Sequence, residues 1–114
     1  NRPHKVIVKK NDMPNKKNQV AINYANGQLN QEGNLKNGER DGLFKDYHKN
    51  GKLKSEGSWK DGNQDGLVKF YHENGQLNQE GNFINGKPEG LWKTYYENGQ
   101  LDFETNYKDG VVID

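Results

Sequence analysis

A tandem repeat with a period of 24 residues constrains the fold of this 114-residue chain more than any other feature. In each copy an Asn-Gly pair is followed by a leucine and then by a glutamate at fixed spacing. The three columns are Asn26-Gly27, Asn50-Gly51, Asn74-Gly75 and Asn98-Gly99; Leu29, Leu53, Leu77 and Leu101; and Glu32, Glu56, Glu80 and Glu104. Such a period indicates one supersecondary unit that is copied along the chain and stabilised by its neighbours.

Each copy has the pattern of a β-hairpin. Asn-Gly suits the two positive-φ positions of a type I′ turn, and the flanking residues are leucine, aromatic and β-branched. We therefore expect strands at residues 67–72, 76–83, 91–96 and 100–107. The second turn pair of each copy, at positions 37, 61, 85 and 109, is expected to open a wider connection such as residues 61–66. Loops should thus alternate between tight and wide.

The second copy illustrates the expected alternation of faces. One face carries Leu53, Ser55, Gly57 and Trp59, and the other carries Lys54, Glu56 and Ser58. Glycine at the Gly57 position recurs in three copies, which leaves room for a neighbouring aromatic ring over the backbone. The few apolar side chains of one copy do not offset the entropy of ordering it, so copies must stack. The predicted fold is all-β: an elongated, single-layer antiparallel meander of tandem hairpin repeats of about 24 residues.

The repeats divide the chain into two parts. Residues 23–114 hold four copies, at 23–46, 47–70, 71–94 and a truncated 95–114, and residues 1–22 form a basic segment or cap. Residues 1–22 carry a charge of +5, although the whole chain carries only +1 and the remainder −4. The basic residues are Arg2, Lys5, Lys9, Lys10, Lys16 and Lys17. They predict either attraction to an anionic surface or a solvated leader; no aromatic residue lies among these lysines, so no nucleic acid partner is expected.

Two motifs that suggest ligand chemistry are better explained by the repeat. Residues 81–87 match a phosphate loop, but Pro88 stands where a hydroxyl must reach magnesium. Asp61, Asn63 and Asp65 match half of a calcium loop, but His72 replaces the bidentate glutamate. Glycine, Asp and Asn at these positions favour turns. We therefore predict no cofactor and no calcium site.

Repeated histidines and glutamates also lack the arrangement that metal binding or catalysis requires. His48 and His72 belong to equivalent strands about 9–10 Å apart, too far for a shared zinc, and solvent-facing rings are expected. The repeated glutamates have nearly identical surroundings, which does not separate two carboxyl pKa values as acid–base catalysis needs. They are expected to accept hydrogen bonds from turn amides or to pair with Lys45, Lys69 or Lys93. With no cysteine in the chain, the sequence predicts no catalytic residue, no metal site and no enzyme.

Residues 95–101, and residues 80–83 continuing to Gly90-Leu91-Trp92, closely resemble the bacterial MORN-repeat variant. That family is named after an antitoxin component of a toxin–antitoxin pair, and the resemblance covers about residues 20–110. It implies a non-catalytic repeat protein, often exported and sometimes toxin-neutralising. Eukaryotic MORN repeats are linked to phosphoinositide membranes and junction scaffolds. The resemblance thus implies a binding module.

Protein–protein binding, including an antitoxin or immunity role, is the first functional hypothesis. Its contact residues are expected to be Tyr24, His48, His72 and Tyr96, which alternate away from the Tyr47 column. The alternative hypothesis is binding of anionic lipid or a host surface through the six basic residues of the N-terminal segment. Pairing of two copies through sheet edges is a third. The expected location is secreted or cell envelope, or cytoplasmic for an antitoxin.

Overall fold

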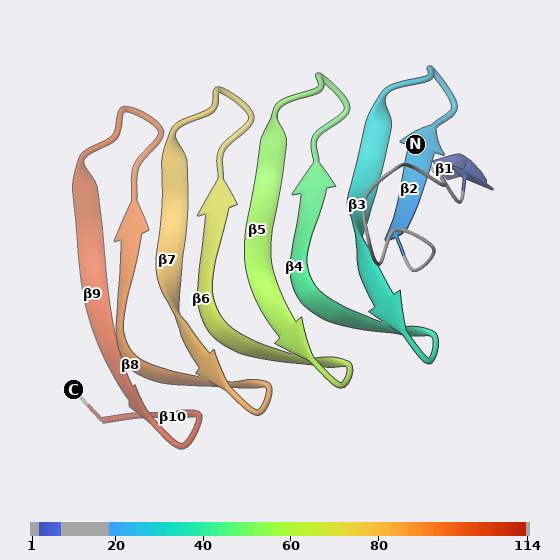
Figure 1. The fold of residues 1–114 in the computed structure, drawn as a ribbon. Coiled ribbons are helices and arrows are strands. Elements are labelled where there is room, and N and C mark those ends of the chain that lie inside the picture. Colours follow the sequence, from blue (N-terminus) through green and yellow to red (C-terminus); the bar gives the residue numbers. More distant parts are fainter. Residues whose placement is uncertain (1–2, 8–18, 114) are drawn as a thin grey trace.

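A computed structural model describes residues 3–7 and 19–113, and within these ranges every regular element is a β-strand. Ten strands form one antiparallel sheet in which each strand pairs with its neighbours in chain order (Figure 1). They are β1 (Pro3–Ile7), β2 (Gln19–Tyr24), β3 (Leu29–Lys36), β4 (Glu39–Tyr47), β5 (Leu53–Lys60), β6 (Asn63–Tyr71), β7 (Leu77–Ile84), β8 (Lys87–Tyr95), β9 (Leu101–Lys108) and β10 (Val111–Val112). The described residues extend over 45 × 30 × 23 Å. The predicted all-β, single-layer meander is confirmed.

Tight and wide loops do alternate, but the prediction assigned them to the wrong turn pairs. The tight two-residue turns lie at Asn37-Gly38, Asp61-Gly62, Asn85-Gly86 and Asp109-Gly110, where both residues have positive φ, as a type I′ turn requires. Consequently β6 begins at Asn63, inside the wide connection expected at residues 61–66. By the same pattern, residues 111–112 form β10 directly after the last tight turn.

The Asn-Gly pairs that define the repeat lie in three-residue loops instead. In the β4–β5 loop, the Gly51 N–H donates to the His48 carbonyl at 2.9 Å and the His48 N–H donates to the Lys52 carbonyl at 2.8 Å. This is a type I turn closed by a left-handed glycine, with Gly51 at φ 88°. The Asn50 side chain stabilises it, because its Oδ1 accepts the Lys52 N–H at 2.9 Å.

The core is a column of large side chains on even-numbered strands, each beside glycines on odd-numbered strands. The solvent-exposed fractions of Phe44, Val68 and Trp92 are only 2%, 3% and 5%. A Cβ added at Gly33 would lie 2.2 Å from the Phe44 ring, and one added at Gly81 would lie 2.1 Å from the Trp92 ring. The predicted packing of a ring against glycine is therefore confirmed at Gly33 and Gly81, whereas Gly57 lies against the aliphatic Val68. Trp92 also makes edge-to-face contacts with Phe83 and Tyr107, at centroid distances of 5.0 and 6.2 Å.

The strands that carry this column bend near their first residues, as β4, β6 and β8 show in Figure 1. Positive φ at Gly42, Gly66 and Gly90 (81°, 108° and 80°) accompanies the bend. A further register shift follows Asp46, so that Tyr47 pairs with Leu53 while Asp46 pairs with Ser55. The alternation expected from Leu53 to Trp59 still holds in burial, because Gly57 is buried and Trp59 half-buried while Lys54 and Ser58 are exposed.

Candidate partner-binding face

A row of alternating acidic and basic residues crosses the face of the sheet opposite the core column. Each member is the direct cross-strand partner of the next, and the seven residues come from β3 to β9 in order. The row contains Glu32, Lys45, Glu56, Lys69, Glu80, Lys93 and Glu104. Opposite charges in directly paired positions stabilise a sheet. We call this side of the sheet the ladder face.

Tyrosine hydroxyls bind three of the carboxylates in this row. Tyr47 donates to Glu32 at 2.6 Å, Tyr71 to Glu56 at 3.2 Å and Tyr95 to Glu80 at 3.0 Å. Burial, together with the hydrogen bond and charge of the adjacent glutamate, raises the pKa of all three phenols above its ordinary value. The expected lysines do lie directly across from these glutamates, but the hydrogen bonds to the three carboxylates come from tyrosine hydroxyls and not from turn amides. Within the described residues the one ion pair joins Arg40 to Asp46 at 3.4 Å.

A second row on the ladder face consists of exposed leucines. Leu43, Leu67 and Leu91 are 52%, 51% and 44% exposed. Each directly precedes the buried residue of its strand, so its side chain points to the opposite side of the sheet. Their cross-strand partners are the polar residues Ser58, Asn82 and Asn106. Successive leucines of this leucine row lie two strand spacings apart, about 10 Å.

The four predicted contact residues lie where even-numbered strands enter the three-residue loops, and three of them bind the next copy. Tyr24 donates its hydroxyl hydrogen to the Tyr47 carbonyl at 2.9 Å. His48 and His72 place Nε2 at 2.9 Å from the carbonyls of Tyr71 and Tyr95, so Nε2 must carry the hydrogen. The expected solvent-facing histidines are thus wrong: both rings are half-buried. Tyr96, in contrast, is 52% exposed.

Most of the basic N-terminal residues lie outside the described ranges. These are Arg2, Lys9, Lys10, Lys16 and Lys17, while Lys5 lies in β1, where the structure describes the backbone alone. Anionic-surface binding by these six residues therefore stays a prediction. In the described part of the chain, no helix is long and apolar enough to cross a membrane.

The ligand motifs form turns and strands. Residues 81–87 run from β7 through a tight turn into β8, and Gly81 lies against Trp92. Asp65 accepts the Asn85 N–H at 3.4 Å and therefore supports the next copy's turn. No group of three or more metal-ligating side chains lies together within residues 20–113.

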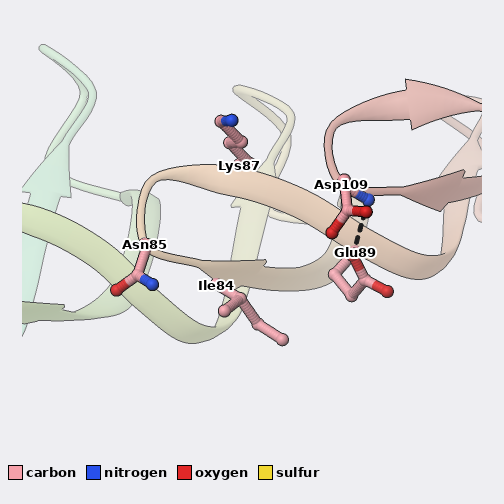
Figure 2. Close-up of a pocket in the computed structure, with 5 residues that line it drawn as sticks. All are labelled: Ile84, Asn85, Lys87, Glu89 and Asp109. Atoms are coloured by element: carbon pink, nitrogen blue, oxygen red, sulfur yellow. Dashed lines mark hydrogen bonds between the residues drawn. The ribbon is translucent and has the colours of Figure 1, made fainter.

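An open depression of about 300 Å³ lies beside the last two tight turns. Figure 2 shows its five lining residues: Ile84, Asn85, Lys87, Glu89 and Asp109. The Asp109 N–H donates to Glu89 at 2.9 Å, which repeats the support that Asp65 gives to Asn85. Ile84 and Lys87 extend to different sides of the turn (Figure 2). This depression therefore results from the stacking of successive tight turns.

Sequence reasoning missed two features of the sheet. The Arg40 guanidinium lies 4.0 Å from the Phe44 ring centroid and 5.0 Å from that of Trp59, a cation–π arrangement that covers the core column. The sequence signal for this contact was a repeat position that changes from copy to copy: it holds Arg40 here and Gln64 and Pro88 in later copies. The exposure of the leucine row was also missed, because the column was visible but its face was not.

Translated hairpins in one open sheet, joined by the same hydrogen bonds from copy to copy, define a tandem β-hairpin repeat protein. The chain belongs to the MORN repeat variant family, whose family model matches residues 21–37, 40–61, 64–85 and 88–109. No curated protein matches the chain. MORN repeats are generally non-catalytic modules that bind proteins or membranes.

Proposed function

We propose that this chain is a protein-binding module that engages its partner through the ladder face. The leucine row carries the proposal: three leucines, about half exposed, occupy the same place in three successive copies. Single exposed leucines are common on protein surfaces, but an aligned series beside charged residues offers a partner repeated apolar contacts. Burial of these leucines against a partner would favour binding, as burial of the apolar core of a protein interface does.

The alternating charges beside the leucine row supply specificity. A partner that places its own charges in the complementary order gains attraction at each position, and a partner shifted by one strand meets like charges. Tyr96 can add an aromatic contact at the loop edge. Tyr24, His48 and His72 have their polar atoms engaged by the next copy, so they offer a partner the carbon edges of their rings.

Affinity capture from the native cell or its host tests the proposal. The bait is the whole chain, compared with a variant in which Leu43, Leu67 and Leu91 are changed to Ser. The matched control is Phe103→Ser, which alters an equally exposed apolar residue (53%) on the opposite face of the sheet. We expect one protein to be recovered in equal amount with the chain and with the control but not with the triple variant. Recovery that is the same with all three baits would overturn the proposed face.

An antitoxin or immunity role is the finer form of this proposal. Its support is the resemblance of residues 80–101 to repeat proteins that are named after an antitoxin component. The captured partner distinguishes the forms: a toxin supports the antitoxin role in the cytoplasm, whereas a host or envelope protein supports an exported role. Pairing of two copies through sheet edges stays a separate prediction that light scattering on the purified chain tests.

A second candidate function is binding to an anionic membrane. The observation that favours it is the +5 charge of residues 1–22 in a chain whose remainder carries −4. Co-sedimentation with acidic vesicles tests it, using neutral vesicles and a variant with all six basic residues changed to Gln as controls. Binding that requires acidic lipid, disappears in high salt and is lost in the variant supports this function. Absence of binding to acidic vesicles at low salt contradicts it.

A further inference from the structure

The ladder face carries two parallel rows, and the pattern of each row is complementary to its own reverse. One is the leucine row, and the other is the row of alternating acidic and basic residues, which we call the charge row. Leu67 and Lys69 are two residues apart on one strand, so the two rows lie on the same face. We propose that a second copy of this chain binds the ladder face, with the two copies related by a twofold axis that runs along the strands between β6 and β7. This inference rests on the proposed function, because both use the ladder face, and it names the partner.

A twofold axis along the strands makes each row face its own counterpart. Rotation about that axis keeps the position along the strands, reverses the order of the strands and turns one ladder face over onto the other. The charge row therefore faces the charge row, and the leucine row faces the leucine row. An axis along the charge row would instead place glutamate on glutamate and lysine on lysine. Like charges in that arrangement repel, which disfavours such an axis.

The alternation of charge also determines where the axis lies. Lysines of the charge row are on even-numbered strands and glutamates on odd-numbered ones. An axis through a strand maps even-numbered strands onto even-numbered strands and places lysine on lysine. An axis between two strands maps even-numbered strands onto odd-numbered ones and places each lysine opposite a glutamate. With the axis between β6 and β7, the facing pairs are Lys69 with Glu80, Lys93 with Glu56 and Lys45 with Glu104.

Both members of these pairs have atoms available for contact with a second copy. Within the described residues the one ion pair joins Arg40 to Asp46, so no lysine of the charge row has a described carboxylate as its ion-pair partner. The hydroxyl of Tyr95 donates to only one carboxylate oxygen of Glu80, Oε2, and the other tyrosine bonds follow the same pattern. A carboxylate accepts at both oxygens, so the second oxygen can accept a lysine N–H from the other copy.

The leucine row requires the same alignment, independently of charge. Its leucines lie two strand spacings apart, about 10 Å, so a gap of one strand separates each leucine from the next. The residues in these gaps are polar and exposed: Ser58, Asn82 and Asn106. An axis between two strands sets each leucine of one copy over such a gap in the other copy. The leucines of both copies then alternate at one strand spacing, about 4.8 Å, and form a continuous apolar contact.

An axis between β5 and β6 would also match the charges, but it fits the leucines less well. It would place Leu91 over Asn34 of β3, which is half-buried, whereas the equivalent residues of β5, β7 and β9 are exposed. Strands of two facing sheets cross at about 30° because each sheet twists, so contacts are closest at the axis. Leu67 and the pair of Lys69 with Glu80 lie beside the proposed axis and should therefore contribute most to the dimer.

The dimer would regulate access to the proposed binding site. In this alignment each copy covers the leucine row of the other. A different protein could then bind the leucine row only after the two copies separate, so the concentration of the chain would determine how much of the ladder face is open.

Sedimentation equilibrium of the whole purified chain tests the proposal. We expect a reversible dimer as the protein concentration rises to about 1 mM, because a small interface binds weakly. Lys69→Glu should raise the dissociation constant at least about tenfold, because it creates like-charge pairs beside the axis. The matched control is Lys60→Glu, which makes the same change of net charge at an exposed residue of β5 outside both rows. A monomer at every concentration, or equal constants for K69E and K60E, would overturn the proposal.

Two further variants test the leucines and the alignment, with circular dichroism to verify that each is folded. The variant with Leu43, Leu67 and Leu91 changed to Ser should stay monomeric where the unaltered chain dimerises. A dimer that persists in it would overturn the proposal in favour of pairing through sheet edges. The exchange K69E/E80K restores opposite charges beside the axis and should restore the dimer. A folded exchange variant that stays monomeric would contradict the axis between β6 and β7.

The dimer and the proposed function fail in different experiments. Sedimentation uses the chain alone, whereas affinity capture detects a different protein on the ladder face. A monomeric chain that captures such a protein through the leucine row overturns the dimer and supports the proposed function. A dimer that follows the expected variant pattern supports this inference even when no different protein is captured.

Discussion

Glycine and a large side chain form one packing unit in the core column, because the ring occupies the space where a Cβ would stand. At Gly81 that space lies inside the Trp92 ring, with a distance of 2.1 Å, and neither the fused ring nor the backbone can move far. At Gly57 the nearest atom is a Val68 methyl carbon at 2.9 Å, which a small side-chain rotation relieves. The same glycine column is therefore not equally demanding in each copy.

Gly81→Ala should be more destabilising than Gly57→Ala. We expect G81A to lower the free energy of unfolding by about 3 kcal/mol and G57A by about 1 kcal/mol, because overpacking against a rigid ring is harder to relieve. Urea unfolding at neutral pH measures both. An equal or larger loss for G57A would contradict the packing described for Trp92.

The tyrosines on the ladder face predict a loss of stability in alkali. Their folded-state pKa values are raised, so the neutral phenol contributes stability that is complete below the unfolded pKa of 10.0 and is lost as pH rises toward the folded pKa. Tyr71→Phe should cost about 1 kcal/mol near neutrality, because the bond to Glu56 is lost. Above pH 10 the gap between the two proteins should narrow, since phenylalanine does not ionise. Parallel pH profiles of unfolding would be inconsistent with the Tyr71–Glu56 bond.

Strands and turns show how two hairpin loops share similar dipeptides but different backbones. Asn-Gly occurs in both loop types, at Asn50-Gly51 and at Asn85-Gly86. What separates them is contact between copies: the Asn50 amide bridges to Glu73, whereas the Asn85 N–H is held by Asp65. Those partners lie 23 and 20 residues away, so local turn preferences could not assign the loops.

Substitution at a tight turn tests this assignment. Asp61 has φ 51°, and Asp61→Ala should cost about 1–2 kcal/mol, because a residue with a Cβ and no local hydrogen bond resists this conformation. Lys49→Ala, in the exposed three-residue loop, should change stability by less than about 0.5 kcal/mol. Thermal or urea unfolding compares the two. A larger loss for K49A would favour the original placement of the tight turn at the other pair.

At the scale of the molecule, the sequence predicts the number of strands per copy, their order in the meander and the packing of rings on glycines, because the repeat specifies these features locally. It does not predict the register between neighbouring strands, since the shifts at Gly42 and at Asp46 depend on contacts between those strands. At the candidate site, the sequence identified Glu32 as one of the repeated glutamates but did not identify its hydrogen-bond partner Tyr47. The two residues are 15 positions apart and lie on different strands. The exposure of Leu43 depends on the same bend, so the sequence did not predict it either.

Deleting residues 48–71 should leave a folded, shorter sheet, because Tyr47 would then precede His72 in the register that Tyr47 and His48 now hold. Stability should fall, and the urea m-value should fall by about a fifth, in line with the surface that is no longer exposed on unfolding. Deleting only residues 48–59 should abolish folding, because an even-numbered strand would meet another of its own kind. Circular dichroism and urea unfolding distinguish the outcomes, and a folded half-repeat deletion would contradict the pairing of glycine with ring.

The hydrogen bonds between neighbouring copies are nearly the same at His48 and at His72. Each added copy therefore lengthens the sheet by one fixed step of two strand spacings, about 10 Å, without altering what came before. The length of the sheet therefore increases in equal steps with the number of copies. Duplication or loss of one module changes the reach of the molecule in whole increments, and evolution can tune the span of a binding surface by counting modules instead of redesigning a fold.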